Sequence, residues 1–211
     1  MTNGWKALPY PTTPGQVGGH EGVGEIVKMG PATELATVKI GDRVGVKWIA
    51  AVCGTCPACL SGHDGVCFNQ KVSGYYTPGT FQQYVTSQAT YVTPIPDKLS
   101  SEAAAPLLCA GVTVFSALRK SNLLSGEWVA VLGAGGGLGH LATQMAAKGM
   151  GYRVIGIDRG DKRDLVLESG AEHFVDFTAS QSVEKDVKDL TGGLGVHAVL
   201  VLTAANAAYA M

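Results

Sequence analysis

The sequence contains few charged residues. Only 16% of its 211 residues are Asp, Glu, Lys or Arg, and 16 basic residues against 17 acidic ones give a formal net charge of −1. A chain so close to neutral has no general electrostatic attraction for nucleic acid or for an anionic membrane surface. Because 46% of the residues are hydrophobic, the composition is that of a folded globular protein and not of a disordered one.

The sequence also shows no pattern typical of a secretory signal or of a membrane-spanning segment. The first residues, MTNGWKALPY, lack the basic start and apolar run of a secretory signal. The most apolar stretch, VHAVLVLTAANAAYA, is interrupted by His197, Thr203 and Asn206 and is too short for a membrane span. We therefore expect a cytoplasmic protein, in which the five cysteines are more readily thiolates or metal ligands than disulfide partners.

Glycine, by contrast, is abundant, and the two halves of the chain differ in pattern. The 29 glycines predict many tight turns and close backbone approaches. Up to about Thr93, short β-rich runs at residues 24–30, 42–50 and 81–87 alternate with Gly and Pro, which predicts an irregular, mostly β domain. Residues 97–120 then predict helix, with Ser100 or Ser101 as N-cap and Pro106 as an interruption.

The second half alternates between strands and helices. Buried strands are predicted at 128–134, 152–158, 173–177 and 196–204, and helices at 140–151, 162–170 and 182–192. Apolar, β-branched strands that alternate with helices are typical of a parallel sheet covered on both faces. The sequence therefore predicts an α/β fold in this half, and we place the domain boundary between residues 112 and 113.

Four cysteines are grouped within fifteen residues. The segment CGTCPACLSGHDGVC spaces Cys53, Cys56, Cys59 and Cys67 as C-x2-C-x2-C-x7-C. Four thiolates can surround a tetrahedral zinc ion and leave no position open, which is typical of a structural site. The alternatives are a redox CxxC pair or a disulfide knot. A nucleic-acid-binding zinc ribbon is disfavoured, since residues 53–67 contain no Lys or Arg.

A glycine-rich turn follows the first strand of the second half. In VLGAGGGLGH, Ala134, Gly136 and Gly139 occupy the three positions of a GxGxxG pattern, and the whole turn comprises Gly133, Ala134, Gly135, Gly136, Gly137, Leu138 and Gly139. Such a strand–turn–helix unit can bind a pyrophosphate at the helix N-terminus. Asp158 ends the next strand, where an acid binds the ribose hydroxyls of NAD and repels the 2′-phosphate of NADP. The neighbouring Arg159 weakens that preference. Alternatively, Asp158 is an ordinary turn residue.

Taken together, these motifs resemble the zinc-dependent medium-chain alcohol dehydrogenases, and most of all the tetrameric fungal type. The family's G-H-E-x-x-G-x5-G signature fits Gly19, His20, Glu21, Gly24 and Gly30. The segments VGVKW, GTFQQY, LLCAGVT, GAGGGLG and GYRVIGID follow in the family's order. The resemblance implies a partial GroES-like domain over residues 1–112, with its zinc lobe at 53–67, and a partial Rossmann domain over residues 113–211.

The resemblance also implies a second, catalytic zinc site. By position, His20 and Cys109 are its ligands, and Glu21 is a second-sphere or alternate ligand. Trp48 matches a pocket residue that narrows the site toward small alcohols, and Lys162 reaches the cofactor ribose. Without the resemblance, Cys109 is interpreted as a buried structural thiol and Trp48 as a core residue.

The implied function is the NAD- and zinc-dependent oxidation of primary, ethanol-like alcohols to aldehydes, and the reverse reaction. The full-length form is expected to be a homotetramer that binds neither nucleic acid nor membranes. The family's upstream G-V-C-H ligand motif and its later strands have no counterpart here, so we expect a central fragment with little activity by itself. The alternative is a catalytically inactive zinc- and nucleotide-binding fragment that acts by associating with full-length subunits.

Overall fold

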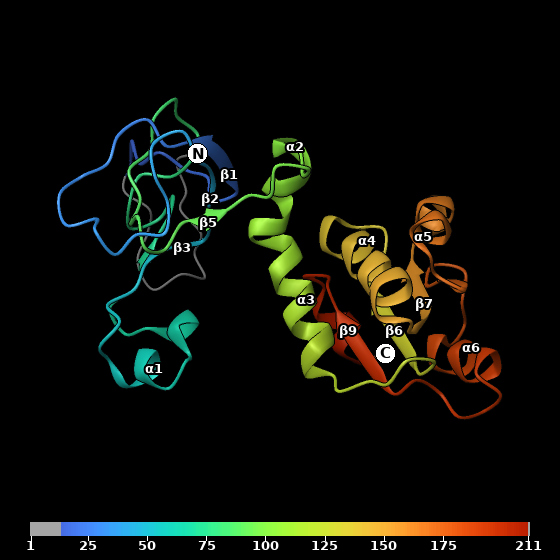
Figure 1. The fold of residues 1–211 in the computed structure, drawn as a ribbon. Helices are drawn as coiled ribbons and strands as arrows, with labels where there is room; N and C mark the ends of the chain where they lie inside the picture. Colours follow the sequence, from blue (N-terminus) through green and yellow to red (C-terminus); the bar gives the residue numbers. More distant parts are fainter. Residues whose placement is uncertain (1–13, 211) are drawn as a thin grey trace. The chain divides into compact units, whose positions relative to one another are not determined.

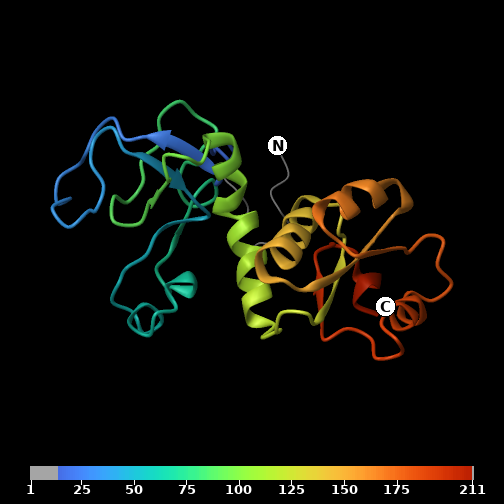
Figure 2. The ribbon, with the colours of Figure 1, turned by 45° about the vertical axis from the view of Figure 1, so that its right-hand side comes forward.

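The computed structural model describes residues 14–210. The chain divides into two compact units, Met1–Cys109 and Ala110–Met211 (Figures 1 and 2). The sequence places the domain boundary between residues 112 and 113, whereas the structural division follows Cys109, which separates two helical segments. The first unit contains two small sheets and one buried cluster, and the second contains one parallel sheet and two buried clusters.

Short antiparallel strands organise the first unit. Strands β1 (Gly22–Glu25), β2 (Arg43–Val46) and β5 (Thr93–Pro94) pair in the order β1-β2-β5, and β3 (Ile49–Ala51) pairs with β4 (Lys71–Val72). Helix α1 (Pro57–Leu60) and a 3-10 turn at Asp64–Val66 lie within the cysteine segment (Figure 1). The irregular, mostly β character predicted for this half is confirmed.

All three predicted strand runs differ from the structure. Of residues 24–30, only Gly24 and Glu25 belong to a strand, because β1 ends at Glu25. Residues 81–87 form no strand. The Phe81 N–H donates to the Gly18 carbonyl at 3.0 Å, but residues 82–87 form no such backbone hydrogen bonds with other described residues. An extended segment without a neighbour leaves its N–H and C=O groups unpaired in a ladder. The run at 42–50 is broken at Lys47 and Trp48, where the chain passes from one sheet to the other.

The predicted helical region divides into three segments. The first segment is α2 (Ser101–Ala104), and Ser100 is its N-cap, since the Ser100 side chain accepts a hydrogen bond from the Ala103 N–H at 3.2 Å. Helix α2 continues into the second segment, a 3-10 helix at Ala105–Leu108 that contains Pro106. Helix α3 (Ala110–Lys120) begins after Cys109. No single helix within residues 14–210 is long and apolar enough to cross a membrane. One pair of helical segments reaches that length and composition only when counted together, Ser101–Leu108 and Ala110–Lys120, and the pair is bent at the break between them.

A four-stranded parallel sheet forms the centre of the second unit. Strands β6 (Trp128–Leu132), β7 (Arg153–Asp158), β8 (His173–Asp176) and β9 (Ala198–Val201) are arranged in the order β8-β7-β6-β9. Three helices separate the strands: α4 (Gly137–Gln144), α5 (Arg163–Ser169) and α6 (Val183–Leu190). A π-helical turn at Met145–Gly149 extends α4, and a 3-10 turn at Asn206–Ala210 follows β9. The alternation predicted from the sequence is confirmed.

Both faces of this sheet are covered. On β6, Val129 belongs to the same buried cluster as Ala142 of α4 and Val166 of α5, whereas its neighbour Ala130 belongs to a second cluster with Val187 of α6. Successive residues of a strand point to opposite faces. A strand that is buried on both faces therefore needs the continuous apolar run that WVAVL supplies, and all five residues are buried.

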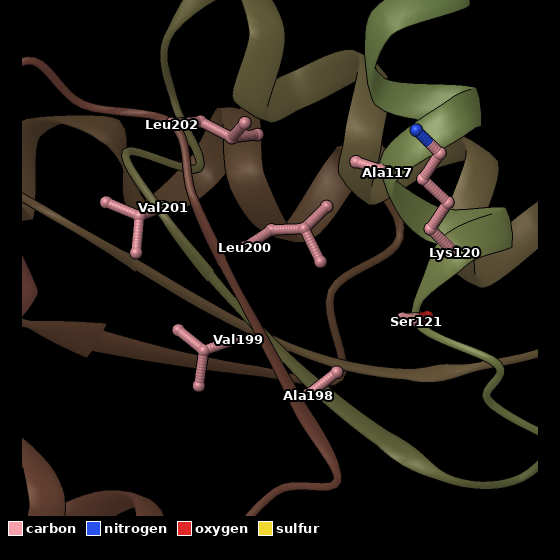
Figure 3. Close-up of a pocket in the computed structure, with 8 residues that line it drawn as sticks. All are labelled: Ala117, Lys120, Ser121, Ala198, Val199, Leu200, Val201 and Leu202. Atoms are coloured by element: carbon pink, nitrogen blue, oxygen red, sulfur yellow. The ribbon is translucent and has the colours of Figure 1, made fainter. Parts of the chain in front are cut away.

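Strand β9 forms one edge of the parallel sheet. A pocket lies between this strand and the C-terminal end of α3, and Figure 3 shows Leu200 pointing toward the helix. Leu200 is 6% exposed, whereas Val199 on the opposite side of the strand is 52% exposed. The pocket lining is mostly aliphatic, with polar side chains only from Lys120 and Ser121 among the described residues.

Candidate functional site

The four clustered cysteines converge on one point. Their sulfur atoms all lie within 4.8 Å of one another, and the separations are 3.6 Å for Cys56–Cys59, 3.9 Å for Cys56–Cys67 and 3.6 Å for Cys53–Cys67. A tetrahedral zinc ion with Zn–S bonds of about 2.3 Å places its sulfur ligands about 3.8 Å apart. A disulfide needs a much shorter distance of about 2.05 Å. The donor set and the spacing therefore fit zinc and not a disulfide.

Backbone amides surround this cluster and hold its sulfur atoms. The Cys56 N–H donates to the Cys53 sulfur at 3.3 Å, and the Asn69 N–H donates to the Cys67 sulfur at 3.4 Å. Backbone N–H groups, first that of Thr55, lower the pKa of Cys53 to about 5 and favour its thiolate. Desolvation and the neighbouring thiols raise the pKa of Cys59 to about 12. For all four cysteines to be thiolates at once, a cation must lie between them.

A polar contact that the sequence did not predict ties the cysteine segment to the rest of the first unit. The hydroxyl of Tyr91 donates to the carboxylate of Asp64, which lies in the 3-10 turn between the third and fourth cysteines. The ammonium of Lys47 lies 4.1 Å from the centre of the Tyr91 ring and 3.3 Å from the Thr93 hydroxyl. Desolvation lowers the pKa of Lys47, while the nearby Asp64 opposes that shift. No sequence pattern links residues so far apart in the chain.

His20 and Trp48 are brought together by strand pairing. In the antiparallel register of β1 and β2, Gly22 lies opposite Val46, so His20 and Trp48 lie opposite each other just beyond the paired residues. Their rings meet edge to face, with centroids 4.9 Å apart at 78°. Trp48 is 38% exposed, which does not fit the alternative of a core residue.

The glycines beside His20 allow backbone segments to pack directly on one another. Gly19 has a φ of +96°, and a Cβ there would lie 2.5 Å from the Thr80 hydroxyl. A Cβ on Gly79 would lie 2.1 Å from the Gly19 carbonyl, and the Thr80 N–H donates to that carbonyl at 3.1 Å. The described backbone that packs on these glycines comes from Gly74 and from residues 79–81.

Cys109 lies at the end of the 3-10 segment, with non-helical φ and ψ of −132° and −67°. The preceding Leu108 packs on β2, since a Cβ on Gly45 would lie 2.4 Å from the Leu108 side chain. Cys109 is half-buried, so it is not the fully buried thiol of the alternative interpretation.

The three predicted ligands of the catalytic zinc are His20, Glu21 and Cys109. Imidazole, carboxylate and thiolate are zinc-binding groups, so the donor chemistry fits. All three side chains are half-buried in the first unit. Within residues 14–210, however, the only group of three or more ligating side chains with mutually close donor atoms is the cysteine cluster. The assignment of His20, Glu21 and Cys109 to a second zinc site stays a prediction.

The glycine turn lies where the strand order of the parallel sheet reverses. The chain passes from β6 through β7 to β8 on one side and returns to the other side of β6 with β9. Ligands of open α/β sheets bind outside the carboxyl ends of the strands at such a reversal. Gly133, which follows β6, has a φ of +80°, and α4 begins at Gly137 without a side-chain cap.

Close packing explains why glycine is required at particular positions of this turn. A Cβ on Gly139 would lie 2.0 Å from the Gly133 carbonyl and 2.6 Å from the Ala134 Cα, so only glycine lets α4 approach the strand end. A Cβ on Gly135 would lie 2.5 Å from the Cβ of Lys162, whose side chain covers the turn. A Cβ on Gly137 would meet no other atom within 4 Å.

Asp158 and the glycine turn are joined directly. One oxygen of the Asp158 carboxylate accepts the Gly135 N–H at 2.7 Å, and the other accepts the Arg159 N–H at 2.8 Å. The predicted cofactor-binding residues therefore lie together at one end of the parallel sheet. They are the residues of the glycine turn, together with Asp158 and Lys162. This arrangement fits a dinucleotide, because the glycines leave the backbone accessible and the carboxylate is held beside the turn. A pocket at β8 and α6 and the pocket at β9 are lined by none of these residues.

Comparisons with known proteins agree with this organisation. The alcohol dehydrogenase GroES-like domain model matches residues 1–97, and the zinc-binding dehydrogenase model matches residues 137–211. The chain is 64% identical to Alcohol dehydrogenase 2 of Emericella nidulans over 217 aligned residues, which cover 100% of this chain and 59% of that protein.

Solved structures show the same fold. The alcohol dehydrogenase of the archaeon Aeropyrum pernix is 33% identical with a TM-score of 0.79 and covers 91% of this chain and 56% of its own. A structure described as an NAD-dependent alcohol dehydrogenase is 32% identical with a TM-score of 0.77 and covers 93% of this chain and 55% of its own.

The chain thus spans between half and two thirds of the length of these relatives. The α/β fold with a GroES-like part followed by a parallel, Rossmann-type sheet is confirmed. The alternative of a catalytically inactive fragment gains no support from these comparisons. Two family models match in order, and a relative aligns with the whole of this chain, so the chain belongs to the zinc-binding medium-chain alcohol dehydrogenases.

Proposed function

We propose that the chain takes part in the NAD-dependent oxidation of small primary alcohols to aldehydes, and in the reverse reduction. The observation that carries this proposal is the hydrogen bond between Asp158 and the Gly135 amide at the reversal point of the sheet. It holds a carboxylate beside a glycine turn, which is what the ribose and pyrophosphate of a dinucleotide require.

The residues of the second unit would bind and orient the cofactor. The N-terminus of α4, which no side chain caps, faces the turn with unpaired backbone N–H groups suited to a pyrophosphate. Asp158 would accept the ribose hydroxyls, and the Lys162 side chain, which lies over Gly135, would close the turn from above. NAD would supply the hydride acceptor.

The residues of the first unit would bind the alcohol. When bound, a catalytic zinc supplies Lewis acidity, which lowers the pKa of an alcohol. His20 and Cys109 would hold that ion, with Glu21 as a second-sphere or alternate ligand. The Trp48 ring, packed edge to face on His20, both fixes the imidazole and occupies space beside it, which favours small substrates. The cysteine cluster would hold a separate, structural zinc.

The wider setting is part of the same proposal. We infer a cytoplasmic enzyme whose full-length form is a homotetramer, on the basis of the resemblance to the tetrameric fungal type. Size-exclusion chromatography with light scattering measures the oligomeric state, and a monomer would contradict this part of the proposal.

Two measurements test the proposed activity. The first is binding of NAD to the purified, zinc-loaded chain, which should weaken strongly in Asp158→Ala. The second is NADH formation from ethanol by a protein of the relatives' full length that contains this sequence, and this activity should be lost in His20→Ala and Cys109→Ser while NAD still binds. A protein of that length that binds NAD and zinc but forms no NADH would overturn the proposed catalysis.

A further inference from the structure

Two cationic side chains lie next to the carboxylate that is proposed to bind the cofactor ribose. Arg159 directly follows Asp158 and donates its backbone N–H to it at 2.8 Å. Lys162 lies across the glycine turn, with its side-chain carbons within 2.5–3.1 Å of a Cβ built on Gly135. Cations in this position are the groups that accommodate the 2′-phosphate of NADP. Taken alone, they would weaken a preference for NAD.

Both cations are paired with the same acid. The Arg159 guanidinium lies 3.3 Å from a carboxylate oxygen of Asp161, and the Lys162 ammonium lies 3.6 Å from that oxygen. Asp161 belongs to the 3-10 turn Gly160–Lys162, which follows β7 and leads into α5. The turn brings the three side chains together beside the end of β7. The two acids and two cations between residues 158 and 162 therefore balance in charge.

We propose that Asp161 is a specificity-determining residue that keeps this site selective for NAD over NADP. It engages Arg159 and Lys162, so neither cation is free to bind a 2′-phosphate, and its own charge adds to the repulsion from Asp158. This inference rests on the proposed function, because it assumes that the dinucleotide binds at the glycine turn. It assigns to Asp161 a role that the sequence pattern places on Asp158 alone.

The exposure of these side chains decides how the proposal can be tested. The side chains of Arg159, Asp161 and Lys162 are 59%, 57% and 40% exposed. Exposed ion pairs contribute little to folding stability. Replacing Asp161 should therefore leave the fold intact while it releases two cations near a doubly charged phosphate. The change in specificity is separable from any change in stability.

The experiment compares NAD and NADP binding to Asp161→Asn and to the wild-type protein by isothermal titration calorimetry. We expect the Kd for NADP to fall roughly threefold to tenfold, the range that two exposed ion pairs allow, with the Kd for NAD changed less than about twofold. The gain should shrink as salt is added, because the released charges are exposed to solvent. Unchanged NADP affinity in Asp161→Asn would overturn the proposal.

Asp164→Asn is the matched control. Asp164 is an exposed acid in the first turn of α5 that forms no ion pair in the described structure. Its replacement by Asn changes the net charge by the same amount as Asp161→Asn does. An equal gain in NADP affinity in Asp164→Asn would show a general charge effect and would also overturn the role of Asp161. If the wild type binds neither dinucleotide, the proposed function fails first, and that outcome is distinct from normal NAD binding without a shift in specificity.

Discussion

At the scale of single residues, the atoms around the cysteine sulfur atoms and around Gly139 leave little room for a different side chain. The sulfur atoms of the cysteine cluster lie 3.6–3.9 Å apart in the pairs that contact one another. In the second unit, Gly139 has no room for a single added carbon. Both constraints can be tested with matched pairs of substitutions.

Cys56→Ser should release the zinc bound by the cysteine cluster and destabilise the segment around it. Serine is a poor zinc ligand, and three remaining thiolates leave the tetrahedral site incomplete. Metal analysis of the purified variant checks this, with Ser61→Ala as the control, because Ser61 lies in the same segment and its replacement keeps all four sulfur ligands. Equal zinc content in Cys56→Ser and the control would contradict the structural zinc site.

Gly139→Ala should destabilise the second unit by about 1–3 kcal/mol, since the new Cβ forces α4 away from the strand end. Gly137→Ala, two residues earlier in the same helix, should be neutral or stabilising by up to about 1 kcal/mol, because nothing lies within 4 Å of its Cβ. Urea denaturation measures both. Equal effects of the two substitutions would show that the turn is not closely packed.

At the scale of secondary-structure elements, pairing and packing position the candidate site. The β1–β2 register places His20 opposite Trp48, and Leu108 packs on Gly45 of β2 just before Cys109. In the same unit, the Tyr91–Asp64 hydrogen bond joins the cysteine segment to the residues before β5. These contacts give the short strands of the first unit a fixed arrangement that so few residues would not maintain alone.

Tyr91→Phe should lower the free energy of unfolding of the first unit by about 1–3 kcal/mol, the cost of a hydrogen bond to a charged acceptor whose partner is removed. The ring, and with it the contact to Lys47, is retained. Tyr84→Phe serves as the control, because Tyr84 is 68% exposed. Urea denaturation of the zinc-loaded protein measures both variants, and an equal loss in the two would argue against the role of Asp64.

At the scale of the whole molecule, the two units have different sources of stability. The first has a buried cluster built on Ile95, Ala104 and Leu108 and contains all four cysteines of the candidate zinc site. The second buries both faces of a parallel sheet in two larger clusters. A small core benefits most from a metal ion, since metal binding adds free energy that the limited apolar surface does not supply.

Chelation of zinc should therefore unfold the cysteine segment selectively. Hydrogen–deuterium exchange should show loss of protection over residues 53–67 after treatment with a chelator, while β6 and β7 keep their protection, because the second unit contains no cysteine. Restoring zinc should restore the protection. Simultaneous loss of protection in β6 would contradict the separate stabilities of the two units.

Much of the second unit and the cysteine site could be predicted from local pattern. Four strands, three helices and the glycine turn follow from period and composition, because a strand buried on both faces must be apolar throughout. Four cysteines at metal-binding spacing lie so close in the chain that a turn and one short helix bring them together. For such features, the interacting residues are neighbours in the sequence, or their type alone dictates their environment.

Contacts between distant residues were decided only by the folded structure. The pairing of His20 with Trp48 depends on a strand register, and the absence of a strand at 81–87 depends on which neighbour lies beside it. The hydrogen bond from Tyr91 to Asp64 depends on how turns place side chains in space. The same is true of the ion pairs that Arg159 and Lys162 form with Asp161. No periodicity encodes these contacts, because each is set by the path of the backbone and not by the residue types alone.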